Sequence, residues 1–376
     1  MTIGMRNEIL GTMKKWLWIE DAMGVDLVLA VAIASMYPGD PVWAFIVDPP
    51  GALKTELCRS FPDGKYAYTV DTLTPQSLIS GFSSKKENID ILSQLDGKLL
   101  IVKDFTTILQ KPTPIRDELF GRLRSAYDGT LQAAFGSGRL KQTRHATFGI
   151  LAAVTPMIDQ YTTVHALLGE RFLRIRTHYN RDRAARAAIK QSGNEKIMRA
   201  EISEIIRVAL DFFAIKNKEL PALKPETEEK ILALADLVSI LRTPVIRDYR
   251  HQVQQAPEAE LATRLVKQLR RMVMSLVVLG NYTYSHIVRL AEDTSPSVRF
   301  SIMKGLYKDE MTIADIVRKL SLPYQFLSSV CEDLWMLKLI DRKLKGDGDS
   351  SSGRKPYLYS LKSEVRKKME ISKFGN

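Results

Sequence analysis

Four short, mainly apolar runs lie in the first half of the chain, and each is typical of a strand buried on both faces. They span residues 42–48, 98–104, 148–154 and 172–177, and a weaker strand candidate covers 66–70. Helical segments separate them, among them 26–36, 53–60 and 115–127. Strands that alternate with helices predict an α/β fold with a mainly parallel, doubly wound sheet.

The pattern changes after residue 180. Long helical stretches are predicted over 182–218, 227–255 and 258–279. Beyond residue 296, three short helices precede two alternating strands that flank a Gly/Asp/Ser-rich tip, which is the order of a winged helix. Since one core rarely grows past about 250–300 residues, we expect several domains. We place an α/β domain at 1–180, a helical lid at 181–295 and an α+β winged helix at 296–376.

The positive charge is concentrated in two segments. The chain carries 55 Lys and Arg against 43 Asp and Glu, a net charge of +12. Residues 116–190 hold 13 basic and 6 acidic side chains, a surplus of seven, and residues 301–376 hold 15 and 10, a surplus of five. Two basic segments favour a polyanionic partner such as nucleic acid over ordinary solvated helix faces.

Cysteines and long apolar stretches are scarce in this sequence, which constrains the compartment and the metal chemistry. The two cysteines, Cys58 and Cys331, are far apart in sequence, which argues against a disulfide framework or a cysteine-rich zinc site. The most apolar window, 25–36, is about half the length that spans a bilayer. We therefore expect a cytoplasmic protein with no membrane partner.

The first apolar run leads into the sequence DPPGALKT, residues 48–55, and then into a helix. A phosphate-binding loop needs this placement, because backbone N–H groups cradle phosphate, a lysine reaches the β/γ-oxygens and a hydroxyl holds Mg²⁺. Lys54 and Thr55 occupy those positions. The expected ATP contacts are Pro50, Gly51, Ala52, Leu53, Lys54, Thr55 and Glu56.

The loop departs from the usual phosphate-loop pattern at two positions. Asp48 and Leu53 stand where glycines are usual. A left-handed backbone would be costly for Leu53, and Asp48 adds a negative charge near the phosphates. A plain strand–turn–helix that happens to contain Lys-Thr is the alternative.

A second motif follows the run at 99–102. Asp104 stands where an acidic residue at a strand end supports the Mg²⁺ shell, so Thr55 and Asp104 are the expected metal ligands. Phe105 follows in place of the usual glutamate that polarises the attacking water. Glu118 or Glu170 could supply that carboxylate, or the chain hydrolyses slowly or only binds nucleotide.

In this order the motifs resemble the AAA+ ATPases over roughly residues 42–280, and within them the branch with an inserted hairpin before the third motif strand. The minichromosome maintenance helicases are its best-known members. The resemblance implies a homo-oligomer, such as a hexameric ring. The KDFTT stretch at 103–107 also resembles a second motif in a poorly characterised set of bacterial and phage ATPases, in which Phe after Asp is normal.

Three further catalytic residues are implied by the resemblance. The stretch FGILAAVTP at 148–156 looks like the sensor-1 strand, with Thr155 in place of the Asn that positions water. GERF at 169–172 looks like the arginine-finger segment, with Arg171 acting on a neighbouring subunit's γ-phosphate. ATRL at 262–265 looks like the sensor-2 helix with Arg264, for which Arg242 and Arg247 are rivals.

Two surfaces are expected to contact DNA. The segment 130–144 falls where the branch carries its hairpin, with Gly136-Ser137-Gly138 at the tip and the cations Arg139, Lys141 and Arg144. In the winged helix, Tyr324 and Gln325 begin the third helix. Phosphate contacts of the wing are expected from Arg342, Lys343, Lys345, Arg354 and Lys355. Glu332 and Asp333 lie on the third helix and argue against strong sequence reading.

These expectations converge on an ATP- and Mg²⁺-dependent, DNA-acting motor, a helicase-like ATPase in replication of a mobile element or phage. Two alternatives stay open. One is a non-motor DNA-binding regulator with a degenerate ATPase fold. The other is a helicase loader or assembly factor that docks other replication proteins, which the short stretch before the first motif strand favours.

Overall fold

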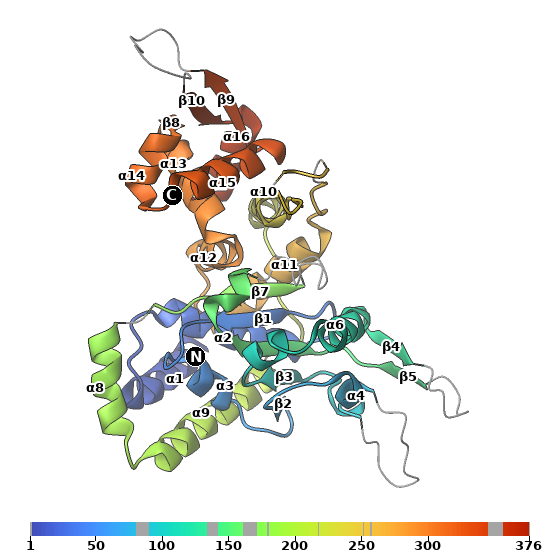
Figure 1. The fold of residues 1–376 in the computed structure, drawn as a ribbon. Helices are drawn as coiled ribbons and strands as arrows, with labels where there is room; N and C mark the ends of the chain where they lie inside the picture. Colours follow the sequence, from blue (N-terminus) through green and yellow to red (C-terminus); the bar gives the residue numbers. More distant parts are fainter. Residues whose placement is uncertain are drawn as a thin grey trace. The chain divides into compact units, whose positions relative to one another are not determined.

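The structure is a computed structural model that describes residues 2–79, 90–133, 142–160, 171–178, 180–216, 218–250, 252–255, 258–344 and 356–375. The chain divides into two compact units, each formed by two stretches of sequence (Figure 1). The first unit comprises Met1–Leu223 and Lys267–Ile287, and the second comprises Lys224–Val266 and Val288–Asn376.

A five-stranded parallel sheet forms the centre of the first unit and confirms the expected α/β class. Its strand order is β2-β3-β6-β1-β7. The strands are β1 (Trp43–Val47), β2 (Ala67–Val70), β3 (Leu99–Val102), β6 (Gly149–Val154) and β7 (Phe172–Ile175). Every residue of β1, β3, β6 and β7 is buried, as the mainly apolar runs predict, and Arg174 of β7 is buried with them.

Successive side chains of each strand point to opposite faces of the sheet, so both faces have apolar side chains to bury. On one face, Trp43, Phe45 and Val47 join a core with α6 that includes Leu119 and Phe120. Helix α2, which is buried from Gly24 to Ser35, packs on the sheet through β6 and β7. The helices in this part are α2 (Ala22–Ser35), α3 (Lys54–Arg59), α4 (Pro75–Leu78), α5 (Thr106–Leu109) and α6 (Thr113–Tyr127), with short 3₁₀ turns at Leu92–Gln94 and Pro156–Gln160.

The hairpin predicted before β6 is confirmed at its base. Strand β4 (Thr130–Ala133) pairs antiparallel with β5 (Gln142–His145), with Thr130 opposite His145. The predicted tip at Gly136-Ser137-Gly138 lies outside the described residues.

Two helices after β7 belong to the first unit, although the sequence placed a boundary at residue 180. They are α8 (Arg181–Gln191) and α9 (Glu195–Lys216), and α9 packs on α1 (Thr2–Trp16). Glu201 of α9 accepts hydrogen bonds from Lys15 Nζ and Trp16 Nε1. Arg199 pairs with Glu56 of α3 at 2.8 Å. These contacts tie the α9 helix to the α/β layers rather than to a separate lid.

The second unit contains the predicted C-terminal elements. They are α13 (Ser297–Lys308), α14 (Ile313–Leu320), α15 (Tyr324–Met336), β9 (Ile340–Leu344) and β10 (Tyr357–Leu361), and the unpredicted β8 (Met311–Thr312) and α16 (Ser363–Ser372) complete them. The antiparallel sheet has the order β8-β10-β9. Thr312 caps α14, since its hydroxyl accepts the Asp315 N–H.

The remaining helices are α10 (Pro225–Arg242), α11 (Thr263–Leu279) and α12 (Tyr284–Thr294). The prediction of one helix over 227–255 is wrong beyond Arg242. Pro244 follows Thr243, and a residue before proline is disfavoured in the helical conformation. Arg247 and Val253 instead form an isolated antiparallel bridge.

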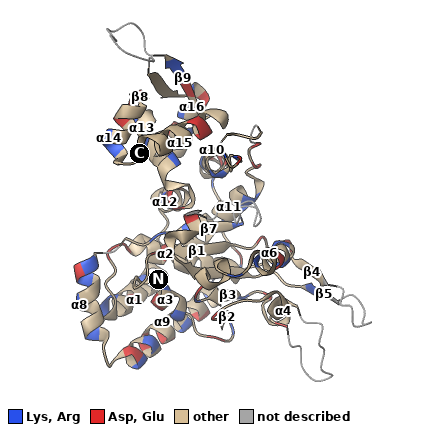
Figure 2. Cartoon of the chain, viewed as in Figure 1, with Lys and Arg blue, Asp and Glu red and all other residues tan. Residues whose placement is uncertain are grey.

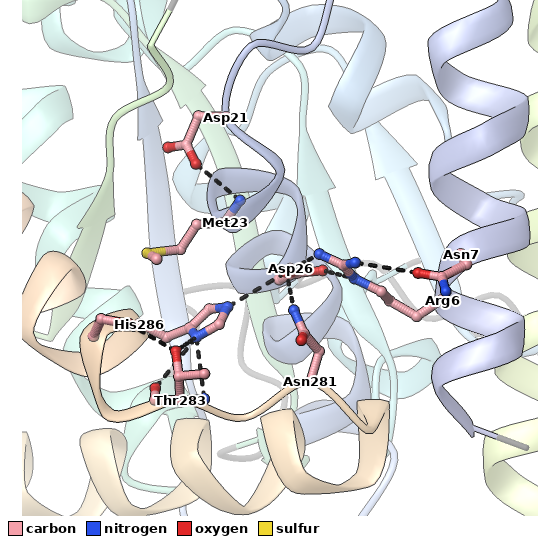
Figure 3. A network of polar contacts seen from close by, with 9 residues as sticks. Arg6, Asn7, Asp21, Met23, Asp26, Asn281, Thr283 and His286 are labelled. Carbon is pink, nitrogen blue, oxygen red and sulfur yellow. Dashed lines mark hydrogen bonds and ion pairs between the residues drawn. The ribbon is translucent and has the colours of Figure 1, made fainter.

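A buried polar network joins α1, α2 and the chain around α12 within the first unit (Figure 3). Asp26 lies on the otherwise apolar α2 and is fully buried. Its carboxylate accepts from Arg6 Nε at 2.8 Å, from Arg6 Nη2 at 2.6 Å and from Asn281 Nδ2 at 2.8 Å. His286 Nε2 lies 3.4 Å from the same carboxylate. These partners hold the pKa of Asp26 below its usual value even though burial raises it.

Within the described part of the chain, no helix is both long enough and apolar enough to cross a membrane.

Candidate functional site

The predicted loop, Asp104 and Thr155 are brought together by the strand order. Strands β1, β6 and β3 are neighbours in the sheet, and Val47 lies opposite Val154. Because parallel strands end at the same edge, the segments that follow them meet there. Thr155 N donates to Thr106 Oγ1 at 3.1 Å, and Thr106 N donates to Asp104 Oδ1 at 2.9 Å. The edge therefore links the segment after β3 to the segment after β6.

The loop between β1 and α3 has a relaxed backbone. Gly51 is left-handed, with φ of 79°, so it occupies a conformation that favours glycine. Leu53 has φ of −62° and ψ of −15°, which is right-handed helical. The anticipated strain at Leu53 is thus absent, because the loop reaches the helix without a left-handed residue before Lys54. Thr55 and Glu56 lie in the first turn of α3.

Lys54 is largely buried at this edge, with 8% of its surface exposed. Its Nζ donates to the Pro49 carbonyl at 2.9 Å, so the ammonium is hydrogen-bonded to the backbone of its own loop. Burial lowers the pKa of Lys54, while the nearby carboxylates of Asp48 and Asp104 act in the opposite direction. Lys54 is therefore a desolvated cation placed between two acidic positions.

Asp48 is turned toward the strand beside β1. Its carboxylate accepts from Thr177 Oγ1 at 2.8 Å and from Thr177 N at 3.2 Å, and only 2% of the residue is exposed. Burial raises the pKa of Asp48 to about 6, although Thr177, Lys54 and Arg176 each favour the charged form. The substitution for the usual glycine thus joins β1 to the segment after β7.

A cavity of about 400 Å³ opens beside the loop. Residues 49–53 form one wall and Glu56 lies next to them. The other walls come from Leu17 and Trp18 after α1 and from the alanine-rich side of α8, including Ala184 and Ala188. Sequence reasoning missed these walls, because nothing in a local pattern relates Trp18 or α8 to a loop so distant in the chain.

The residue after Asp104 is part of the core. Phe105 is buried against Phe45, Phe120 and Phe172, with ring centroids 4.8, 6.3 and 5.9 Å away. A carboxylate at that position would be buried among rings, which explains the departure physically. Glu118 forms an ion pair with Arg122 at 2.7 Å, and Glu170 lies outside the described residues.

Arg171 lies at the edge of the sheet opposite the loop, because it precedes β7 whereas Lys54 follows β1. Its guanidinium lies 5.3 Å from the Tyr127 ring centroid and 3.4 Å from the Asp128 carboxylate, and the residue is 5% exposed. Arg171 therefore cannot serve the loop of its own chain. Acting on a neighbour would require it to leave Asp128.

Two arginines that follow Arg171 in the chain, Arg174 and Arg176, lie nearer the loop edge. Arg174 and Arg176 both pair with Asp159, at 2.7 and 2.8 Å. Arg176 directly follows β7, and its charge favours the ionised form of Asp48. No local pattern distinguishes Arg176 from the other cations of residues 116–190, so the sequence does not indicate this position.

The predicted sensor-2 arginine and its rivals lie in the second unit. Arg264 pairs with Glu260 at 2.8 Å. Arg242 is buried. Arg247 pairs with Glu332 at 2.9 Å and with Asp333 at 2.6 Å, which gives it a structural role under α15.

The expected DNA-contacting residues have different surroundings. Arg144 pairs with the buried Asp90 at 2.8 Å, so it also anchors the base of the hairpin. Tyr324 and Gln325 are exposed at the start of α15, and Lys343 is exposed on β9. Arg342 stacks 3.7 Å from the Trp335 ring centroid. Outside the described residues lie Arg139, Lys141, Lys345, Arg354 and Lys355.

No group of three or more His, Cys, Asp or Glu side chains suited to a metal ion occurs among the residues that the structure describes. A magnesium ion held by one hydroxyl, one carboxylate and phosphate oxygens would not need such a group. Neither a known protein family nor a curated protein matches this chain.

Proposed function

We propose that this protein is an oligomeric, ATP-binding AAA+ protein that acts on DNA, as a DNA-dependent ATPase or helicase-like motor in replication of a mobile element or phage. The observation that carries the proposal is the meeting of Lys54, Asp104 and Thr155 at one edge of the parallel sheet. Ligands of open α/β sheets bind outside the carboxyl ends of the strands, where these residues lie.

The site fits a nucleoside triphosphate in size and chemistry. A cavity of about 400 Å³ with largely apolar walls can hold a base and sugar beside the loop. Lys54 would contact the phosphates, and Thr55 and Asp104 offer the hard oxygen ligands that Mg²⁺ prefers. When bound, the ion would neutralise charge on the phosphates. Asp48 faces Thr177 rather than this cavity's walls, so its charge opposes binding less than its sequence position implies.

An oligomer gives Arg171 its proposed role. Since Arg171 lies at the sheet edge away from its own loop, a catalytic contact with phosphate requires a second copy. A finger supplied in trans can raise the rate about 10³–10⁵-fold. Arg264 is proposed as the sensor of the lid, and Thr155 as the residue that orients water.

The DNA-acting part of the proposal rests on the β4–β5 hairpin and the C-terminal unit. The sequence places three cations on or near the hairpin, and β9 carries exposed Lys343 with Arg342 beside it. The order α13, α14, α15, β9, β10 supports a winged helix as the proposed module. Glu332 and Asp333 are neutralised by internal arginines, which removes the objection that they would repel phosphate.

The test is ATP turnover with and without single-stranded and double-stranded DNA, for the wild type and for Lys54→Ala. We expect DNA-stimulated turnover that falls at least about 100-fold in Lys54→Ala, because a buried cation next to the developing phosphate charge is lost. Lys98→Ala is the matched control, since Lys98 precedes β3 at the opposite edge of the sheet, and its turnover should stay near wild type.

Equal turnover in all three proteins would refute the assignment of Lys54. Tight DNA binding without turnover in any of them would favour the regulator. These two results separate the catalytic claim from the DNA claim.

A second candidate function is protein docking by the C-terminal unit, as in a loader or assembly factor. It is favoured by large apolar side chains that are exposed there, with Tyr324 and Leu344 each 60% exposed. Phe326, Trp335 and Tyr357 are also exposed, and aromatic residues are enriched at protein interfaces. The direct test is isothermal titration of this protein with a chosen replication protein. A second test is the DNA affinity of Phe326→Ser. An unchanged DNA affinity would agree with docking, because the exposed ring would then serve a protein partner rather than DNA.

A further inference from the structure

A second pocket, of about 370 Å³, lies between the end of α1 and α8, within the first unit. Its polar lining is entirely basic. The cations are Lys14, Lys15, Arg183, Arg186 and Lys190, and Trp16 and Trp18 lie among them. In Figure 2 the ribbon of α8 carries blue segments, which mark its Lys and Arg residues. The proposed ATP site and the two predicted DNA surfaces use none of these five cations.

The basic lining follows from how α8 is built. Arg183, Arg186 and Lys190 are spaced i, i+3 and i+7, so they form one stripe of the helix. Ala184 and Ala188 form another stripe, which faces the cavity beside the loop. One helix therefore presents mainly alanines to the first cavity, together with Arg181 and Gln191 from its two ends, and cations to the second.

Few carboxylates offset this charge. Glu201 pairs with Lys15 at 2.7 Å. Among the described residues, no carboxylate lies within ion-pair distance of Lys14, Arg183 or Arg186. Clustered like charges repel, and a polyanion would relieve that repulsion.

The pocket is preformed rather than assembled from loose side chains. Lys190 Nζ donates to the Lys15 carbonyl at 2.6 Å, and Gln191 Nε2 donates to the Trp16 carbonyl at 3.0 Å, which fastens α8 to the end of α1. The Arg183 guanidinium lies 4.7 Å from the Trp18 ring centroid, so the ring fixes its position. Lysines in the last turn of α1 are also favoured by the helix dipole.

We propose that this pocket binds the phosphodiester backbone of a single-stranded nucleic acid. Regularly spaced cations beside an aromatic ring are the combination that single-strand sites use. The volume suits about one nucleotide unit of a longer strand. The choice of nucleic acid over another polyphosphate rests on the proposed function, whereas the basic pocket itself does not.

The experiment measures binding of a fluorescein-labelled 20-nucleotide oligo(dT) by anisotropy, at several salt concentrations and without ATP. The test variant is Arg183→Gln with Arg186→Gln. We expect about tenfold weaker binding and a salt slope reduced by about 1.4, since each lost single-strand phosphate contact removes about 0.7. The control is Lys196→Gln with Lys216→Gln, which removes the same charge from exposed positions of α9.

An equal loss in the test and control variants would mean general attraction to a basic protein and would overturn the site. Linear inorganic polyphosphate of 20 units is the competitor that distinguishes the source of the phosphates. Polyphosphate binding that depends on Arg183 and Arg186, with oligo(dT) binding that does not, would also overturn the proposal.

Lys14→Gln is a milder second variant, expected to reduce the salt slope of oligo(dT) binding by about 0.7. Because ATP is omitted, failure here is independent of the Lys54 result.

Discussion

Replacing Asp26 with alanine is expected to lower the free energy of unfolding by about 3–5 kcal/mol, because it leaves the largely buried guanidinium of Arg6 without its counterion. Arg6 makes two hydrogen bonds to Asp26, and its side chain is 14% exposed. Asn281 and His286 would lose an acceptor in the same step (Figure 3). His286 Nδ1 accepts the Thr283 N–H, which leaves the Nε2 proton directed at Asp26. Urea unfolding at pH 7 measures the loss.

Two comparisons make the Asp26 result specific. Glu204→Ala breaks an exposed ion pair with Arg207 and should lower the free energy of unfolding far less than Asp26→Ala, because solvent screens this pair. The double variant Arg6→Leu with Asp26→Leu should be more stable than either single change, because removing both charges avoids an unpaired one. If Asp26→Ala costs no more than Glu204→Ala, the network is not a stabilising element of the fold.

The lowered pKa of Asp26 also sets the pH range over which its carboxylate contributes to stability. Its folded-state pKa lies below the ordinary value of 3.8, so its contribution is present above that value and is lost as pH falls through the folded pKa. Stability differences between wild type and Asp26→Ala should therefore be nearly constant from pH 6 to 8 and shrink only in strong acid.

Asp48→Asn is expected to stabilise the protein at pH 8, by about 3 kcal/mol as an upper bound. The Asp48 pKa is raised from 3.8 to about 6 in the folded state, so folding favours the protonated form. The stabilisation from the protonated form is fully present below pH 3.8 and is lost as pH rises through 6. At pH 8 the buried carboxylate is ionised and destabilises the folded state, whereas the neutral amide of asparagine does not. At pH 5 the advantage of the variant should be about half as large. Asparagine can still hydrogen-bond to Thr177 N and Oγ1.

Urea unfolding of both proteins from pH 5 to 8 measures this difference. Asp104→Asn is the control at the same sheet edge, and because Asp104 is exposed, its substitution should change stability by less than about 0.5 kcal/mol. If Asp48→Asn is less stable than wild type at pH 8, the prediction is wrong. The negative charge of Asp48 would then stabilise the fold through its attraction to Lys54.

The elements of this fold were largely readable from local pattern. Buried strands such as β1 and β6 appear as unbroken apolar runs, and the cap of α14 depends only on Thr312 and Asp315, which are three residues apart. The helix predicted over 227–255 ends at Arg242 for a local reason, because Pro244 disfavours a helical conformation of Thr243. Helix α16 was missed because its few apolar positions, such as Val365 and Met369, form only a short stripe.

The site was readable only in part. The sequence pointed to Lys54, Thr55 and Asp104 because a loop after a strand has a local signature. It did not indicate that Leu53 would be helical, that Asp48 would bond Thr177, or that Phe105 would join the core. Each of these depends on which residues from other strands lie next to the position.

The sequence by itself determined the α/β class of the first unit, the strand that carries the loop and the residue types offered to phosphate, since periodicity and turn chemistry act over a few neighbouring residues. Tertiary structure alone decided the strand order that gathers Lys54, Asp104 and Thr155, and the packing of α8 that sets Trp18 beside the loop and Arg183 beside Lys14. These contacts join segments from about 30 to about 170 residues apart, and no local pattern encodes which distant surfaces a helix or strand will cover.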